Sequence, residues 1–153
     1  MTVPRIVRKE TRLFNVGHAV TASGWVETTA GIYSLALNLS TKVLMIPLPN
    51  LPVGRQISGF RVLGALGATA DNATVIDAAL HKVTKGAGAV TDSEVGAITQ
   101  VSVVADTTLD SEKVFTRPEL VKDDYQYYAK ITGTTANNAA CDVAVTGVEV
   151  DVE

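Results

Sequence analysis

The sequence predicts a single all-β domain, a β-sandwich of the jelly-roll type with about eight strands, and an immunoglobulin-like sandwich is the alternative. A chain of 153 residues is the length of one domain and can bury a core without disulfides or a metal. Its apolar residues are mostly Val, Ala, Ile and Leu, Thr is abundant, and charged residues make up only 19%; this mixture favours sheets. Turn residues recur about every ten positions, as in sandwiches, and no segment has the spacing of a good amphipathic helix.

In the first third of the chain, short apolar runs bordered by glycine or proline predict strands at 13–16, 32–37 and 42–46. The segment 47–52 has three prolines in six residues. Proline lacks the N–H that a central strand donates to its neighbour. We therefore expect a rigid extended crossover at 47–52.

The middle of the chain alternates between apolar runs and glycine or polar segments. The glycine-rich segments Gly64–Ala68 and Lys85–Ala89 are interpreted as hairpin turns, since neither opens a helix nor matches a phosphate-binding loop. A polar link is expected at 106–112, and 111–122 could hold one helical turn. Strands are expected at 57–66, 75–84 and 98–104.

Two late strands are the best defined. In 125–132, apolar and polar residues alternate as in a half-buried strand. In 143–152, valines occupy odd positions up to Val145 and even positions from Val148 onward. Because the two faces of a strand alternate with period two, the apolar set would change faces midway. The sequence therefore predicts a β-bulge at Thr146–Gly147.

The residues needed for catalysis or cofactor binding do not cluster in the sequence. His18, His81 and Cys141 are too widely separated to predict a zinc site. No Gly-x-Ser-x-Gly motif occurs, and a surface pair between Asp77 and His81 is the nearest approach to a catalytic pair. Turn aspartates and asparagines could bind calcium but are also ordinary turn formers. We expect no cofactor, no metal and no enzymatic activity.

Charge is unevenly distributed along the chain. The whole chain carries −3. Residues 1–12 hold four basic residues and one acidic residue, a net +3, which leaves −6 on 13–153. We expect 1–12 to be a basic arm that docks on an acidic neighbour or is simply solvated, followed by a sandwich domain at 13–153. The basic residues of the arm are Arg5, Arg8, Lys9 and Arg12.

The acidic body and the lack of long apolar runs limit the classes of partner. Nucleic-acid binding needs a basic face, so no nucleic-acid partner is expected. No apolar run reaches the roughly 20 residues of a membrane span, so no membrane partner is expected. The start of the chain lacks the apolar core of a signal peptide, and we expect synthesis in the cytoplasm.

Two aromatic residues are candidates for contacting a partner. Trp25 lies between Gly24 and Val26 in a polar stretch and could anchor an interface. Tyr128 points away from Tyr125 and Tyr127 on the alternating strand, so at least one of these three should face solvent or a partner.

The segment from Leu51 to Val152 resembles small β-sandwiches encoded among phage structural genes. The resemblance implies a capsid decoration (cement) protein, a head fibre or a domain of a tail fibre or spike, commonly trimeric. The similarity is one of residue pattern and covers about two thirds of the chain. Residues 1–50 match no such protein. The segments that carry it are Leu51–Val62, Ala78–Val83, Asp124–Ile131 and Val145–Val150.

From the sequence we favour a non-enzymatic phage virion structural protein, most simply a capsid decoration protein. It would form a homotrimer in the virion, bind the major capsid protein or other virion subunits, and stabilise the shell through buried subunit contacts. The alternative is a carbohydrate- or receptor-binding module of a tail fibre or spike.

Overall fold

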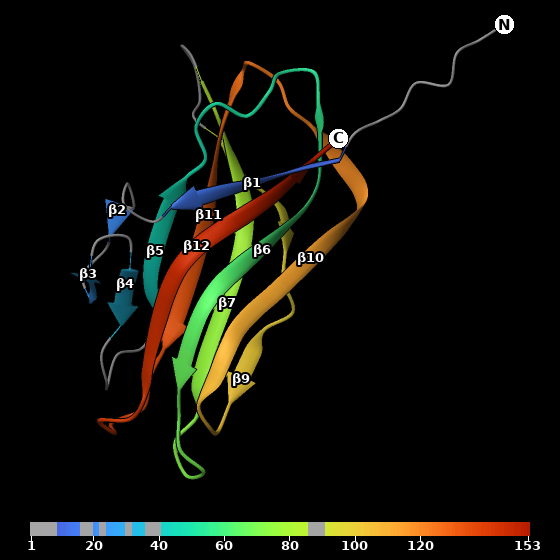
Figure 1. The fold of residues 1–153 in the computed structure, drawn as a ribbon. Coiled ribbons are helices and arrows are strands. Elements are labelled where there is room, and N and C mark those ends of the chain that lie inside the picture. Colours follow the sequence, from blue (N-terminus) through green and yellow to red (C-terminus); the bar gives the residue numbers. More distant parts are fainter. Residues whose placement is uncertain (1–8, 16–19, 22–23, 30–31, 36–40, 86–90) are drawn as a thin grey trace, which may run out of the picture.

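The computed structural model describes residues 9–15, 20–21, 24–29, 32–35, 41–85 and 91–153, which form two packed antiparallel sheets (Figure 1). This confirms the expected β-sandwich. The strands are β1 (Glu10–Asn15), β2 (Val20–Thr21), β3 (Trp25–Thr29), β4 (Ile32–Leu35), β5 (Lys42–Pro47), β6 (Gln56–Gly67), β7 (Thr74–Thr84), β8 (Asp92–Ala97), β9 (Val101–Val103), β10 (Thr107–Leu120), β11 (Tyr125–Thr134) and β12 (Asp142–Val152).

Each sheet combines strands that are far apart in the sequence. The first sheet has the order β10-β6-β12-β4-β3, and β1 also pairs with β12. The second has the order β2-β5-β11-β7-β8, and β9 also pairs with β7. β1 and β4 follow one another on the same edge of β12, because β1 pairs with residues 147–152 and β4 with residues 143–145.

The core lies between the sheets and is built from the inward faces of the long strands. Along β7 and β11, buried and partly exposed residues alternate, as expected when one face of a sheet is covered. Phe60 and Val150 from the first sheet and Leu80 and Ile131 from the second are almost fully buried.

The predicted β-bulge in β12 is confirmed. The register with β6 shifts between Val145, opposite Gly64, and Gly147, opposite Leu63. The shift lets the valines before and after it face the core, and Val145 and Val148 are both fully buried.

The sequence predicted a hairpin turn that includes Gly64–Gly67. These residues instead form the end of β6. A Cβ on Gly64 would collide with the carbonyl oxygen of Ala144 in β12. Glycine here allows two backbones to approach closely, so its role is in packing rather than in turning the chain.

The segment 106–122 was expected to hold a polar link and a helical turn. Instead, Thr107–Leu120 forms the long strand β10. β10 is the last strand at its end of the first sheet, and residues such as Asp110 and Glu112 are exposed. An edge strand with a solvated face needs few apolar residues, so it lacked a recognisable strand pattern. β8 was missed as well: it contains Gly96 and three exposed polar residues.

The proposed arm at 1–12 overlaps the fold, since β1 pairs with β12 from Glu10 onward. Arg5 and Arg8 lie outside the described residues, as does most of the expected turn at 85–89. Within the described ranges, the chain has no helix long and apolar enough to cross a membrane.

Candidate ligand-binding cleft

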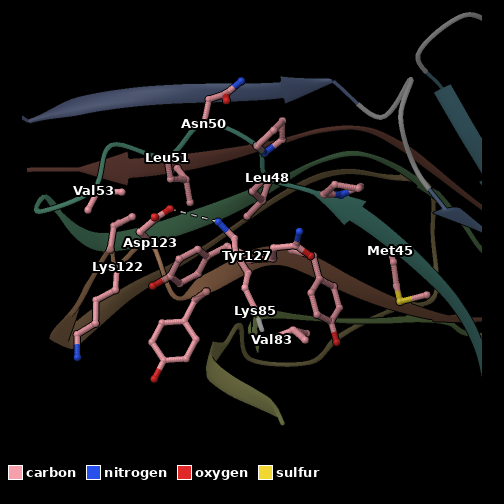
Figure 2. Close-up of a pocket in the computed structure, with 16 residues that line it drawn as sticks. Met45, Leu48, Asn50, Leu51, Val53, Val83, Lys85, Lys122, Asp123 and Tyr127 are labelled. Atoms are coloured by element: carbon pink, nitrogen blue, oxygen red, sulfur yellow. Dashed lines mark ion pairs between the residues drawn. The ribbon is translucent and has the colours of Figure 1, made fainter. Parts of the chain in front are cut away.

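A cleft of about 670 Å³ lies at the end of the sandwich where β5 and β10 end and β11 begins (Figure 2). This volume is in the range of small-ligand sites. Its lining residues are Met45, Pro47, Leu48, Pro49, Asn50, Leu51, Val53, Val83, Lys85, Val121, Lys122, Asp123, Tyr125, Gln126, Tyr127 and Tyr128.

The connection predicted at 47–52 crosses from β5 in the second sheet to β6 in the first and forms one wall of the cleft. It is not extended as expected, because the chain turns at Pro49–Asn50, and Pro47 is still the last residue of β5. Leu48 and Leu51 are buried, and the Leu48 amide donates to the carbonyl of Tyr127 at 3.0 Å. Asn50 has a φ of 60°, a left-handed conformation that asparagine tolerates better than most residues. The crossover is therefore held against the start of β11.

Tyr127 belongs to the floor of the cleft and ties the two sheets together. Its hydroxyl lies 3.3 Å from both the Glu119 carboxylate and the Leu120 carbonyl in β10. Lys82 in β7 pairs with the same carboxylate at 2.7 Å. Burial raises the pKa of the Tyr127 hydroxyl to about 12, and the Glu119 charge adds to the shift. Tyr127 therefore stays neutral at physiological pH.

Tyr125 lies beside Tyr127 at the side of the cleft. Their ring centroids are 6.3 Å apart in an edge-on arrangement, and the Lys82 ammonium lies 4.8 Å from the Tyr125 ring centroid. This cation–π contact and the edge contact hold the partly exposed Tyr125 ring in place.

Tyr128 points to the outer face of the second sheet, on the side opposite Tyr127. Its ring stacks on His81 of β7 with centroids 5.2 Å apart, and its hydroxyl donates to Asp92 of β8 at 2.9 Å. His81 Nδ1 lies 3.1 Å from the other oxygen of the same carboxylate. Burial, then the hydrogen bond and charge of Asp92, raise the pKa of Tyr128 to about 12.

Polar side chains surround the mouth of the cleft. Lys85 pairs with Asp123 at 3.5 Å (Figure 2). Lys122 and Gln126 are exposed beside them, and Asn50 is exposed on the facing crossover. The site thus combines an apolar, tyrosine-rich interior with hydrogen-bonding groups at the mouth.

The residues predicted to contact a partner are not all in one place. Tyr128 lines the cleft. Arg12 lies near it, donating to the carbonyl of Asn50 at 2.8 Å while pairing with Glu10 at 2.9 Å. Lys9 pairs with Asp151 at 2.7 Å, so its ammonium group is engaged within the protein.

Trp25 is not the exposed anchor that the sequence analysis expected. Only 4% of it is exposed, and it belongs to the core cluster. Gly133 in the second sheet leaves room for the indole: a Cβ there would lie 3.1 Å from the Trp25 ring. The flanking polar residues made Trp25 look exposed, whereas it faces the core opposite the fully buried Leu35 of β4.

The suggested pair of Asp77 and His81 is wrong. Residues four positions apart on a strand are separated by roughly 13 Å. His81 instead contacts Asp92, and Asp77 accepts a hydrogen bond from Gln100 at 2.9 Å. Sequence reasoning missed Asp92 as a site residue because β8 itself carried no strand signal.

In the described part of the chain, no group of three or more His, Cys, Asp or Glu side chains is arranged to hold a metal ion. Cys141 is buried, with its thiol 3.4 Å from the Asn72 carbonyl, at the end of the sandwich away from the cleft.

Comparisons by sequence found no match to a protein-family model or to a curated protein. Comparisons of structure did find similar folds. A family two carbohydrate esterase from Cellvibrio japonicus is similar over 95% of this chain and 35% of its own, with a TM-score of 0.54 and 7% identity.

Two further structures come from xylan-related proteins. The CBM22-1–GH10 modules of Clostridium thermocellum xylanase 10B, complexed with xylohexaose, match 94% of this chain and 25% of their own, at TM-score 0.50 and 11% identity. The CBM22-2 xylan-binding domain of Paenibacillus barcinonensis Xyn10C matches 94% of this chain and 91% of its own, at TM-score 0.48 and 11% identity.

The two similarities with TM-scores of 0.54 and 0.50 show the fold. The chain spans about a third of the esterase and a quarter of the xylanase structure. The small β-sandwich implied by the phage resemblance is thereby supported, whereas none of these three comparisons concerns a capsid. Fold and cleft together define the molecule as a jelly-roll-like sandwich with a tyrosine-lined site at one end.

Proposed function

We propose that this protein is a non-catalytic carbohydrate-binding module and that the end cleft binds a glycan. The observation that carries this proposal is the presence of two partly exposed tyrosines, Tyr125 and Tyr128, among the residues that line the cleft, with polar groups at its mouth. A sugar ring has an apolar C–H surface and peripheral hydroxyls. It therefore fits a site that combines aromatic surface with a few hydrogen-bonding groups.

The charges around the cleft favour an uncharged glycan. Among the lining residues, Lys85 is paired with Asp123, and Lys122 is the other charged side chain. Beside the lining, Lys82 is paired with Glu119. With most of these charges in ion pairs, the site has only a weak net field to attract an anionic polymer. Binding should accordingly change little with salt concentration.

Affinity electrophoresis against a panel of soluble polysaccharides tests the proposal. Xylan is the first probe, because the xylanase structure similar in fold was solved with xylohexaose. Methyl-esterified and de-esterified pectin provide a matched neutral and acidic pair. We expect retardation by a neutral polymer, lost in Tyr125→Ala and Tyr128→Ala and kept in Val114→Ala, an exposed residue of β10 in the first sheet. If no polymer retards the protein, the proposal is wrong.

The virion role inferred from sequence resemblance remains a second proposal, in which the first sheet contacts coat subunits. Leu13 in β1, Val26 in β3 and Val114 in β10 are each more than 60% exposed, and all three belong to that sheet. Burial of these side chains would contribute to such a contact. Co-sedimentation with capsids, compared between the wild type and Leu13→Ser/Val114→Ser, tests this role. Equal binding by both would count against it.

A further inference from the structure

We infer that the Tyr128 ring is the surface against which a sugar of the bound glycan packs, and that Asp92 and His81 are positioning residues that hold this ring in place. This inference rests on the proposed glycan-binding function and assigns roles within that site. It involves residues from three strands, β7, β8 and β11.

The register of the second sheet determines which face of the Tyr128 ring is free. Tyr128 lies opposite Pro47 of β5 on one side and His81 of β7 on the other. His81 covers the ring from the β7 side, with an interplanar angle of 27°. Pro47 and Met45, on the β5 side, line the cleft together with Tyr128, whereas His81 is not among the lining residues. The ring face turned away from His81 is therefore the one toward the cleft.

Asp92 fixes both aromatic rings through one carboxylate. One oxygen accepts the Tyr128 hydroxyl at 2.9 Å, and the other lies 3.1 Å from His81 Nδ1. The His81 side chain is only 12% exposed, so it forms a firm support beneath the tyrosine. A ring that is already fixed loses little rotamer freedom when a ligand packs on it, and this improves affinity.

The other two tyrosines are less suited to this role. Tyr127 is only 6% exposed and its hydroxyl is used between the sheets. Tyr125 is held by a cation–π contact and an edge contact, but no hydrogen bond of its hydroxyl is seen within the described residues. Tyr128 alone of the three combines a stacked support, an anchored hydroxyl and a face toward the cleft.

The test compares Asp92→Ala with Asp92→Asn, using xylohexaose as the probe in isothermal titration calorimetry. Asp92→Ala should weaken binding about 3- to 10-fold, the cost of immobilising one free side chain. Asp92→Asn keeps an oxygen that accepts the Tyr128 hydroxyl and should restore most of the affinity. Asp77→Ala, an aspartate of β7 in the same sheet bonded to Gln100, is the matched control and should bind as the wild type does.

A double-mutant cycle separates positioning from a general loss of structure. In the Tyr128→Phe background, Asp92→Ala should have a smaller effect on binding, because the hydroxyl that it anchors is already gone and only its contact with His81 remains to be lost. Spectrophotometric titration of the tyrosines supplies a readout that needs no ligand: Asp92→Ala should lower the pKa of one tyrosine from about 12 toward its ordinary value of 10.0.

The outcomes distinguish the inference from the function on which it rests. If the wild type binds xylohexaose and Asp92→Ala binds equally well, the positioning role is wrong and the glycan-binding function stands. Equal losses from Asp92→Ala in the Tyr128 and Tyr128→Phe backgrounds would also overturn the positioning role. If the wild type binds neither xylohexaose nor any polymer of the panel, the proposed function and this inference both fail.

Discussion

At the scale of single residues, glycine positions control how closely the strands of the first sheet approach. Gly64 faces the Ala144 carbonyl, where even one methyl group would collide with backbone. Gly147, at the bulge, faces a side-chain atom of Leu13 at 3.0 Å, and Leu13 is 65% exposed. At Gly64 the neighbouring atom belongs to the backbone of the adjacent strand and is fixed. At Gly147 it belongs to an exposed side chain that can shift.

Gly64→Ala should therefore lower the free energy of unfolding by about 1–3 kcal/mol, the usual cost of overpacking, or prevent folding altogether. Gly147→Ala is the matched control and should cost less, because the exposed Leu13 side chain can shift aside. Urea denaturation of the two variants measures the difference. A Gly64→Ala protein as stable as the wild type would contradict the close approach.

Tyr127→Phe removes a hydroxyl that contacts Glu119 and Leu120 across the two sheets. We expect a loss of about 1 kcal/mol in unfolding free energy, typical of one hydrogen bond. Glu119 keeps its ion pair with Lys82 in this variant, which limits the loss. Tyr33→Phe, a tyrosine of β4 in the first sheet, provides the comparison in the same denaturation assay.

Some of these residue roles could be predicted from the sequence. Alternation along 125–132 placed Tyr128 on the face opposite Tyr127, as observed. It could not reveal Asp92 as the partner of Tyr128, because that contact depends on β8 pairing with β7 at one particular register. Trp25 was misassigned because a short strand among polar residues carries no clear burial signal.

At the scale of secondary-structure elements, β12 organises the first sheet by pairing with β6 on one side and with β4 and β1 on the other. Asp151 in β12 fastens β1, pairing with Lys9 and accepting a hydrogen bond from Thr11 at 2.6 Å. Burial raises the pKa of Asp151, but these hydrogen bonds and the Lys9 charge outweigh it. The net pKa lies below the ordinary 3.8.

Because the pKa of Asp151 is lower in the folded than in the unfolded protein, its contribution to stability is present above the ordinary pKa. It is lost as the pH falls through the native value. Asp151→Asn should therefore lower stability at neutral pH and weaken the dependence of stability on pH at the acidic end. Urea midpoints measured from neutral to acidic pH check this, with Asp71→Asn, in the turn after β6, as control. Parallel pH profiles of Asp151→Asn and the wild type would contradict it.

The elements themselves were predictable where one face is buried and the other solvated. β7, β11 and β12 follow this pattern, and the change of valine register in β12 located its bulge. β10 and β8 were not predictable in the same way, because their exposed positions dominate their composition. Their strand structure comes from pairing with β6 and β7 rather than from local preference.

At the scale of the whole molecule, the two sheets share one core, with buried residues from both in the same cluster. A single cooperative unfolding transition is therefore expected. Trp25 fluorescence reports on the first sheet, and tyrosine absorbance is weighted toward β11 of the second. The two unfolding curves should coincide in the wild type. In Ile131→Ala both should report the same loss of about 2–5 kcal/mol in the free energy of unfolding, the usual cost of truncating a fully buried residue. Separate transitions would mean that the sheets unfold independently.

The sandwich class could be predicted from composition and turn spacing, but the cleft could not. Its walls come from residues 45–53, 83–85 and 121–128, which are brought together only by the pairing of β11 with both β5 and β7. No local motif records such an arrangement. The proline-rich crossover was recognised as a connection, while its position against Tyr127 depends on the packing of the whole sandwich.

The pairing of β1 with β12 has a practical consequence for handling the protein. Glu10 lies opposite Val152, and Glu153 exchanges backbone hydrogen bonds with Gln56, close to the crossover that borders the cleft. A reporter fused after Glu153 on a short linker would therefore start near the binding site and obstruct large polymers. The turn at Asn137–Asn138, between β11 and β12, lies at the opposite end of the sandwich. A single cysteine introduced there would immobilise the protein with its cleft facing away from the support.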